Sequence, residues 1–392
     1  RQRWLERWPS RYSSANNHRL AELVALVVLN ERGESSSSTA AFLKELELEL
    51  RKQFLKDGFS AELSFGYHLF CFDLILVLHL LAPESALRVI SEARLREIGA
   101  VTRKIIDKCQ MWPAANDSDE ALILARLVHR QSAPLFLLSI LGIEAEHQES
   151  LLSLQDAGYS FATVPGSQRG ITLMIDHGDI GYWPLAAHGH ADTLSMWLFV
   201  NGQPWLIEAG TYCYQDARGF RDKLRSGSMH NTLTLEGQSL SLPSGPFIWN
   251  PRNCVVGHLD YAHSAKDSVN LSVSAKRRGS VIATRKLQLD EQGITLTDIA
   301  GRGQSIESHF ILAPGFDQVL AISHGSARVR DELGNEMGIR SLQLSELAVE
   351  KIKVSREYGH LVDALKVTAK SIERNQLRIE IVGRTTERQG FH

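Results

Sequence analysis

Residues 187–192 read AHGHAD, and they are followed by the apolar stretch LSMWLFV at 194–200, the dipeptide Asn201-Gly202 and the segment LIEAGTY at 206–212. An Asn-Gly dipeptide between two apolar stretches is typical of a β-hairpin, so we expect the chain to turn back on itself here. A third histidine, His230, lies farther along. Three imidazoles and a carboxylate gathered around one hairpin predict a metal site, a catalytic site, or one of each.

From about residue 158 onward, the sequence has the short, alternating apolar pattern of strands. Many such strands at short spacing indicate an antiparallel β-sandwich or a related two-sheet domain. The segments expected to form strands are 172–176, 194–200, 232–235, 269–275, 280–289, 294–299, 306–312, 327–330 and 377–382.

Before that point, apolar residues recur at helical spacing, and the connections between the segments are short. We therefore expect successive helices that pack as hairpins. The segments expected to be helical are 19–30, 38–57, 63–81, 84–109, 121–128 and 135–143. The fold class is multidomain α and β, with a helical domain at 1–155 and the β-sandwich at 156–392.

The composition limits the function classes. The chain has 392 residues, 43% of them hydrophobic and 22% charged, and a formal net charge of −2. These values are typical of a globular protein and argue against a general nucleic-acid binder. The longest apolar run, 69–82, contains Asp73 and His79, so no transmembrane segment is expected. Four cysteines without CxxC spacing argue against a zinc ribbon.

A ligand set of His190, Glu208 and His230 is compatible with the hairpin, which brings Glu208 back toward the strand that follows His190. Zinc is commonly held by three such ligands and a water. The alternative is that Glu208 forms a salt bridge and the histidines are hydrogen-bonded loop residues.

Other candidates lie in the helical half and just before His230. Asn16, Asn17 and His18 stand at a helix start, where either asparagine could be an N-cap. Tyr67 lies in an apolar helix, where a tyrosine usually belongs to the core. Three arginines precede His230, and they form either a solvated basic face or a site for an anionic substrate. They are Arg218, Arg221 and Arg225.

The stretches HGHADTLSMWLFVNGQPWLIEAGTY at 188–212 and LRSGSMHNTLTLEGQS at 224–239 resemble the heparinase II/III-like family of polysaccharide lyases. The helical half resembles it in SSANNHRLAEL at 13–23, DGFSAELSFGYHLF at 57–70 and NDSDE at 116–120. The resemblance implies an (α/α) toroid followed by an antiparallel β-sandwich, with the active site in the cleft between them. Because the family's toroid has further helices before the Asn-Asn-His segment, we expect an incomplete toroid.

Such enzymes cleave uronic-acid-containing polysaccharides by β-elimination, which requires a neutralised carboxylate, a base and an acid. By this resemblance, Asn17 and His18 would engage the carboxylate or assist at C5. Tyr67 would act as acid or base on the glycosidic oxygen, and His188 would be a second base candidate.

The resemblance also implies residues that bind substrate and metal. Arg225, Asn16 and Tyr212 would bind the substrate. His190, Glu208 and His230 would hold Zn²⁺ or another divalent cation that shapes the site. The chain departs from the family at Glu208, where an aspartate is usual, and the added methylene shifts the carboxylate.

The expected partner is an acidic polysaccharide or oligosaccharide, and the location implied by the resemblance is periplasmic or secreted, although no signal peptide is present. The sequence is compatible with an oligomer. The alternative function is a non-catalytic lyase-like module that binds an acidic glycan during export or assembly. A cupin-like metalloenzyme fits less well, because its glutamate follows the His-x-His pair within about five residues. A hydrolase is least favoured, since no well-placed carboxylate pair accompanies the histidines.

Overall fold

The computed structural model describes residues 2–12, 16–33, 39–119, 121–145, 149–164, 169–216, 218–343 and 345–382. Residues 13–15 and 120, which belong to the quoted motifs, therefore lie outside the described part. The chain forms two compact units. The helical unit comprises 1–148, 154–157 and 181–189, and the β unit comprises 149–153, 158–180 and 190–392. The segment 181–189 thus belongs to the helical unit, although strands flank it in the sequence.

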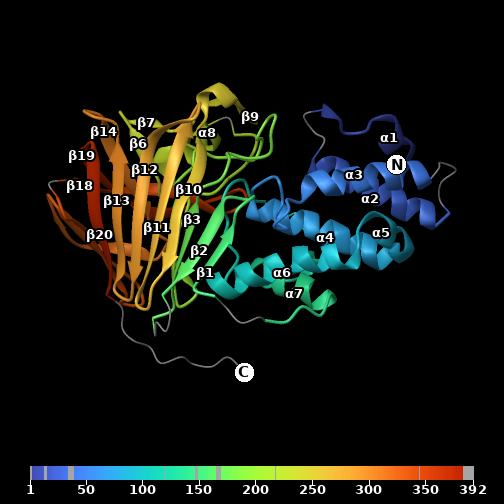
Figure 1. Ribbon diagram of the computed structural model, residues 1–392, viewed down its shortest axis with the longest axis horizontal. Coiled ribbons are helices and arrows are strands. Elements are labelled where there is room, and N and C mark those ends of the chain that lie inside the picture. Colours follow the sequence, from blue (N-terminus) through green and yellow to red (C-terminus); the bar gives the residue numbers. More distant parts are fainter. Residues whose placement is uncertain are drawn as a thin grey trace. The chain divides into compact units, whose positions relative to one another are not determined.

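The helical unit contains seven α-helices among its described residues. They are α1 (Gln2–Arg7), α2 (Asn17–Glu31), α3 (Thr39–Gln53), α4 (Phe65–Leu81), α5 (Pro83–Val89), α6 (Glu92–Cys109) and α7 (Ala133–Ile140) (Figure 1). α4 packs between α2 and α7, which explains why it is apolar along nearly its whole length. α6 instead has one buried stripe, as expected for an amphipathic helix at a surface.

Two of the expected helices differ from the sequence prediction. The single helix predicted over 84–109 is wrong, because α5 ends at Val89 and Ile90 is extended. Ser91 then caps a new helix by accepting a hydrogen bond from the Arg94 amide. The helix predicted over 121–128 is also wrong. Only a short 3₁₀ turn, Ala125–Leu127, forms there, and the Asp73 carboxylate accepts hydrogen bonds from the amides of Ile123 and Leu124.

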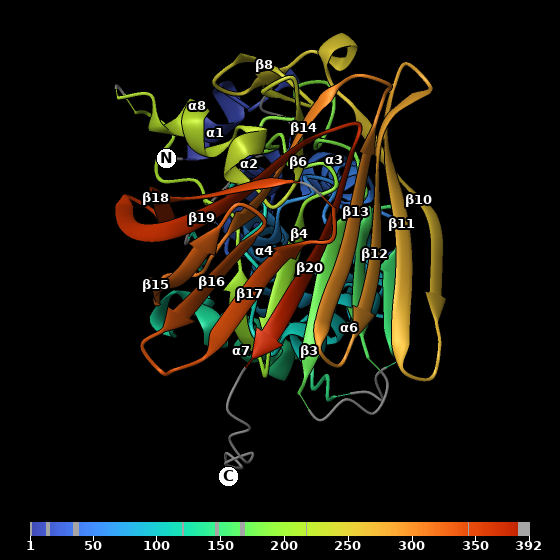
Figure 2. The same cartoon turned by 90° about the vertical axis from the view of Figure 1, so that its left-hand side faces the viewer.

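The β unit is built from antiparallel strands. A five-stranded sheet has the order β1 (Leu151–Leu154), β2 (Tyr159–Thr163), β3 (Ile171–Asp176), β4 (Met196–Val200), β5 (Gln203–Leu206). An eight-stranded sheet has the order β10 (Val256–Ser264), β11 (Ser268–Arg277), β12 (Ser280–Asp290), β13 (Gly293–Ala300), β20 (Arg374–Val382), β17 (Glu336–Ser341), β16 (Ser326–Asp331), β15 (Phe316–Ser323), and Figure 2 shows these strands side by side.

A second five-stranded sheet has the order β18 (Glu346–Glu357), β19 (His360–Ile372), β14 (Ser305–Ile311), β6 (Leu233–Leu235), β7 (Gln238–Ser239). The shorter elements of the unit are α8 (Phe220–Leu224), β8 (Pro243–Gly245) and β9 (Ile248–Trp249). Apolar side chains from all three large sheets form one continuous core. The predicted arrangement of helices followed by antiparallel sheets is confirmed.

The predicted Asn-Gly hairpin is confirmed. Val200 of β4 pairs with Gln203 of β5, and the two residues between them have positive φ, 50° for Asn201 and 72° for Gly202. That conformation belongs to the tight turn that an Asn-Gly dipeptide favours.

Among the described residues, no helix has both the length and the apolarity needed to cross a membrane.

Candidate functional site

The starts of α2 and α4 bring polar residues together in the helical unit. Asn16 caps α2 as the sequence suggested, since its side chain accepts a hydrogen bond from the His18 amide. Asn17 follows as a buried residue, 3% exposed, while His18 is exposed. At the start of α4, Ser64 accepts from the Tyr67 amide and donates to the Asp117 carbonyl. These caps fix Asn17, Tyr67 and Asp117 relative to the backbone.

Glu62 is the acceptor at the centre of this group, and the sequence did not single it out. Its Oε1 accepts from the Asn17 amide (3.0 Å) and from Gln53 Nε2 (2.6 Å), and its Oε2 accepts from Asn17 Nδ2 (2.7 Å). The side chain is 1% exposed. Burying a charge is costly unless it is paired and hydrogen-bonded, which is the condition met here.

His188 supplies the positive partner. Its Nε2 lies 3.2 Å from Glu62 Oε2, and its Nδ1 lies 3.3 Å from Asp117 Oδ2. Burial alone would lower the pKa of His188, but the hydrogen bonds that its ring donates to both carboxylates, together with their negative charges, outweigh burial and raise that pKa to about 9. Burial would likewise raise the pKa of Glu62, yet His188, Asn17 and Gln53 hold it below its usual value.

Tyr67 lies directly against this group. Its ring stacks on the His188 ring with centroids 3.8 Å apart, and its hydroxyl donates to Asp119 Oδ2 at 3.2 Å. Asn17 Nδ2 is 3.5 Å from His188 Nε2. The structure thus brings together three of the four residues expected to be catalytic, Asn17, Tyr67 and His188. Among the described contacts, the exposed His18 side chain does not join them.

A pocket of about 290 Å³ opens onto this group within the helical unit. Glu62 and His188 form part of its wall, and Asn16 and Lys52 add further polar groups. Trp183 contributes an aromatic wall. A pocket with aromatic walls and a few convergent charged groups is the usual form of a small-ligand site.

The two other expected substrate residues lie in the β unit. Arg225 is 1% exposed, and its guanidinium donates to Asp222 and to the carbonyls of Gly245 and Pro246. Tyr212 is half-buried with a positive φ of 64°, and its hydroxyl accepts a hydrogen bond from the exposed Arg218. Of the two arginines, Arg218 is the one that reaches solvent.

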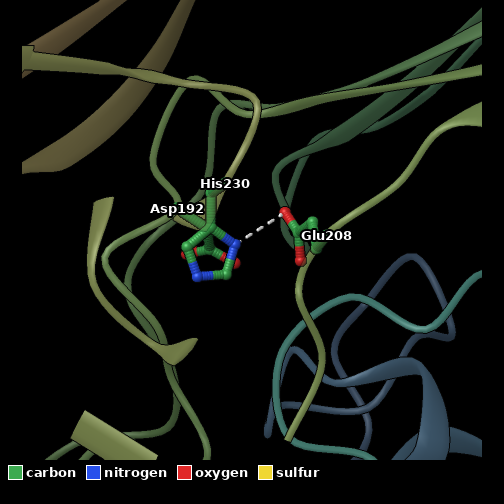
Figure 3. Close-up of side chains that lie close together, drawn as sticks. All are labelled: Asp192, Glu208 and His230. Atoms are coloured by element: carbon green, nitrogen blue, oxygen red, sulfur yellow. Dashed lines mark ion pairs between the residues drawn. The ribbon is translucent and has the colours of Figure 1, made fainter. Parts of the chain in front are cut away.

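A candidate metal centre lies in the β unit, where Asp192, Glu208 and His230 each offer a ligand atom and these atoms lie within 4.8 Å of one another (Figure 3). Figure 3 shows the Glu208 carboxylate facing the His230 ring, and His230 Nδ1 lies 3.3 Å from Glu208 Oε1. The sequence proposed His190, Glu208 and His230. His190 is adjacent, with its ring centroid 5.2 Å from that of His230, and Asp192 completes the three.

The donor set fits a divalent cation. His230 Nε2 and Glu208 Oε2 are buried and have no hydrogen-bond partner among the described residues. Burial would raise the pKa of Glu208, but the charges of His230 and His190 lower it. Burial, with the charges of Glu208 and Asp179, raises the pKa of Asp176 well above its usual value. Several carboxyl groups lie close together at this site, and a bound cation would favour their ionised forms.

Two family models match the sequence. The model described as "Heparinase II/III-like, C-terminal" matches residues 146–380, and "Heparinase II/III N-terminus" matches residues 4–95. The chain belongs to the heparinase II/III family. This confirms the family expected from the motifs around the hairpin and the helix starts.

Solved structures of heparinases share the fold. Heparan sulfate lyase HepC from Pedobacter heparinus is 16% identical with a TM-score of 0.72, over 98% of this chain and 62% of that one. A heparinase III structure is 16% identical with a TM-score of 0.74, over 97% of this chain and 63% of that one. A further heparinase III gene product is 14% identical with a TM-score of 0.73, over 97% and 61%. The comparison with curated protein sequences gives no significant match.

The chain therefore spans less than two thirds of the length of these heparinase structures. At 14–16% identity the likeness shows the fold alone.

Proposed function

We propose that the chain is a polysaccharide lyase that cleaves a uronic-acid-containing acidic glycan by β-elimination. The observation that carries this proposal is the convergence of Asn17, Tyr67 and His188 around the buried Glu62, beside a pocket of about 290 Å³. Family membership supports the same class of reaction. One structure of the same fold is a heparan sulfate lyase, and this likeness, together with the motifs quoted above, supports an acidic glycan as the proposed partner.

The reaction sets the roles. The C5 proton of a uronate is weakly acidic, so its carboxylate must be neutralised before a base can remove that proton. The electron pair left at C5 forms the C4–C5 double bond, the C4–O bond breaks, and the leaving oxygen takes a proton. No water is consumed, and the product carries an unsaturated uronate.

Asn17 and His188 are proposed to act on the carboxylate end. Asn17 Nδ2 can donate a hydrogen bond, and His188 carries a positive charge at neutral pH because two carboxylates flank it. Serving as a base would first require His188 to lose that proton. His18, exposed at the start of α2, remains a candidate for contacting the same carboxylate.

Tyr67 is proposed as the group that exchanges a proton with the glycosidic oxygen. Its ring stacks on that of His188, and its hydroxyl donates to Asp119. Asn16 at the pocket wall, together with Tyr212 and Arg225 of the β unit, is proposed to contribute to substrate binding. For Arg225 this contribution is indirect, since its donors already bind Asp222 and two carbonyls.

We further propose that Glu208 and His230, with Asp192 or His190, hold Zn²⁺ or another divalent cation. A bound cation would fix the loops that carry these residues, and no chemical step is assigned to it. The helical unit is proposed to be part of an (α/α) toroid and the β unit a β-sandwich, and a periplasmic or secreted location would suit an acidic-glycan substrate.

The test is incubation of the purified protein with heparan sulfate, alginate and related uronates while ultraviolet absorbance is followed. The unsaturated product absorbs, so a rising signal on at least one glycan is expected. Absence of signal on all of them, together with measurable glycan binding by calorimetry, would favour the non-catalytic binding module.

A further inference from the structure

Asp192, Glu208 and His230 all lie outside regular strands. Asp192 precedes β4, Glu208 follows β5 and His230 precedes β6. Their mutual distances therefore depend on the hydrogen bonds that connect three separate backbone segments. Metal affinity is sensitive to such connections, because ordering loose ligands on binding costs conformational entropy.

Asn231, the residue after His230, makes the first set of these connecting hydrogen bonds. It is fully buried, and its Nδ2 donates to the carbonyls of Met196 (2.7 Å) and Ile207 (2.8 Å). Its Oδ1 accepts from the Ile311 amide at 2.6 Å. One carboxamide thus uses both donors and its acceptor to connect the segment that carries His230 with those that carry Asp192 and Glu208.

Arg285 of β12 makes the second set of hydrogen bonds that connect these segments. It stands opposite Asp298 of β13 in the strand register, and both side chains are fully buried. Nε and Nη2 of Arg285 bind the two carboxylate oxygens at 2.7 Å each, which is a bidentate pair. Its Nη1 donates to the carbonyls of Leu194 (2.8 Å) and Asn231. Leu194 lies two residues after Asp192, and Asn231 directly follows His230.

A second buried arginine in the same sheet shows that these carbonyl contacts are not a general property of a paired arginine. Arg378 of β20 also forms a bidentate pair, with Asp290 at 2.7 and 2.8 Å. Its Nη1 also donates to the Thr295 hydroxyl at 3.1 Å, within the sheet. Arg285 differs because its third nitrogen, Nη1, binds carbonyls outside the sheet, in the segments that carry the metal ligands.

We propose that Arg285 is a positioning residue for the metal centre, held in place by Asp298 and acting through the backbone at Leu194 and Asn231. The proposal rests on the metal site of the proposed function. A lysine would keep the charge beside Asp298, but it lacks the planar guanidinium, whose several N–H donors bind the carboxylate and both carbonyls at once. Without the guanidinium, the segments that carry Asp192 and His230 would move apart.

The test measures Co²⁺ binding to the full chain by calorimetry and by the visible absorption of the bound ion, which reports its coordination geometry. Arg285→Lys is expected to bind Co²⁺ roughly 10–100-fold more weakly than the wild type, with a changed spectrum. Arg378→Lys, the matched control, is expected to keep wild-type affinity and spectrum.

Arg285→Lys could be poorly folded, so a second variant removes both charges. The double variant Arg285→Met with Asp298→Leu leaves no unpaired buried charge, and such replacements are often neutral for stability. It should show the same weakened Co²⁺ binding in a protein that melts cooperatively. Wild-type affinity and spectrum in this folded double variant would overturn the proposal.

His230→Ala separates this result from failure of the metal site itself. If the wild type binds Co²⁺ and His230→Ala does not, the site is real and the Arg285 variants decide the proposal. If His230→Ala binds as the wild type does, or the wild type binds none, the metal centre fails and the role of Arg285 fails with it.

Discussion

The ring of His188 stacks on the ring of Tyr67, with centroids 3.8 Å and planes 24° apart, and a different carboxylate holds the polar end of each. Asp117 lies 3.3 Å from His188 Nδ1, and Asp119 accepts from the Tyr67 hydroxyl at 3.2 Å. Neither ring can turn without breaking one of these contacts. The pair therefore presents one positively charged group and one phenol in a fixed arrangement, as proton transfer requires.

Replacing Tyr67 by Phe keeps the stack on His188 and removes only the hydroxyl. We expect kcat to fall by about 10²–10⁴-fold, the usual contribution of a positioned acid or base. Turnover is measured by the absorbance of the unsaturated product, and thermal melting serves as the control for folding. A folded variant that retains wild-type turnover would refute the role of Tyr67.

Replacing Glu62 by Ala removes the acceptor shared by Asn17, Gln53 and His188. Breaking a buried pair in this way typically costs ~3–5 kcal/mol, and urea unfolding should show a loss of that size. Glu47→Ala is the matched control, because that glutamate pairs with the exposed Arg51 at the surface of α3. The control should lose at most ~1 kcal/mol. Equal stabilities for the two variants would contradict the central role of Glu62.

Stability is expected to fall on mild acidification because of His68. Burial lowers the pKa of His68 to about 3, and its Nδ1 accepts from the Ser60 amide, so there is no room for a second ring proton. The unfolded chain protonates this side chain near pH 6.5. Between pH 6.5 and about 3 the unfolded state therefore binds the extra proton, and the free energy of unfolding decreases as pH falls through this window.

The contribution of one such histidine approaches about 1.4 kcal/mol for each pH unit below 6.5. Urea unfolding at pH 7 and pH 5 measures it, with His68→Gln as the comparison. The variant should lose less stability between the two pH values than the wild type. A wild type and variant with the same pH dependence would show that His68 does not titrate on unfolding. His309, buried in the β unit with a pKa lowered to about 3, contributes with the same sign in both proteins.

Arg225 and Arg218 are expected to behave differently. Arg225→Met should destabilise the protein by about 1–3 kcal/mol, because the carbonyls of Gly245 and Pro246 lose their donor. Arg218→Ala should leave the melting temperature near the wild-type value and raise KM for an acidic glycan, since Arg218 is exposed beside Tyr212. A raised KM for Arg225→Met without loss of stability would restore Arg225 as a direct substrate ligand.

Removal of metal should lower the melting temperature. An ion bound only by the folded state at 100 times its Kd stabilises by about 2.7 kcal/mol, so dialysis against a chelator should shift melting downward and added Zn²⁺ should reverse the shift. Glu208→Ala should melt at one temperature with or without chelator. A wild type that is insensitive to chelator would argue against the metal centre.

The family and the order of helices and strands could be predicted because they depend on local signals. The Asn201-Gly202 turn, the cap at Asn16 and the apolar α4 are each visible within a few residues of sequence. The break between α5 and α6 was missed because its cause, extended backbone at Ile90 followed by the Ser91 cap, interrupts a continuous helical pattern. Helix propensity differs little between neighbouring residues here, so it does not predict where one helix ends and the next begins.

The chemistry of the site depended on contacts between distant segments. Glu62 and Asp117 act through His188, which lies 126 and 71 residues farther along the chain, and no local pattern reports that approach. Asp192 was part of the quoted histidine stretch, yet its place beside Glu208 and His230 follows from loop geometry after the hairpin. Arg285 and Asp298 face each other only through the register of β12 and β13.

The most direct test of the proposed reaction is mass spectrometry of the glycan products formed in heavy-oxygen water. β-Elimination breaks the C4–O bond without adding water, so products read before the new reducing end exchanges its anomeric oxygen with the solvent should lack the label, and one should carry an unsaturated uronate that absorbs in the ultraviolet. Products that carry one labelled oxygen and no ultraviolet absorbance would be those of a hydrolase and would contradict the proposed function.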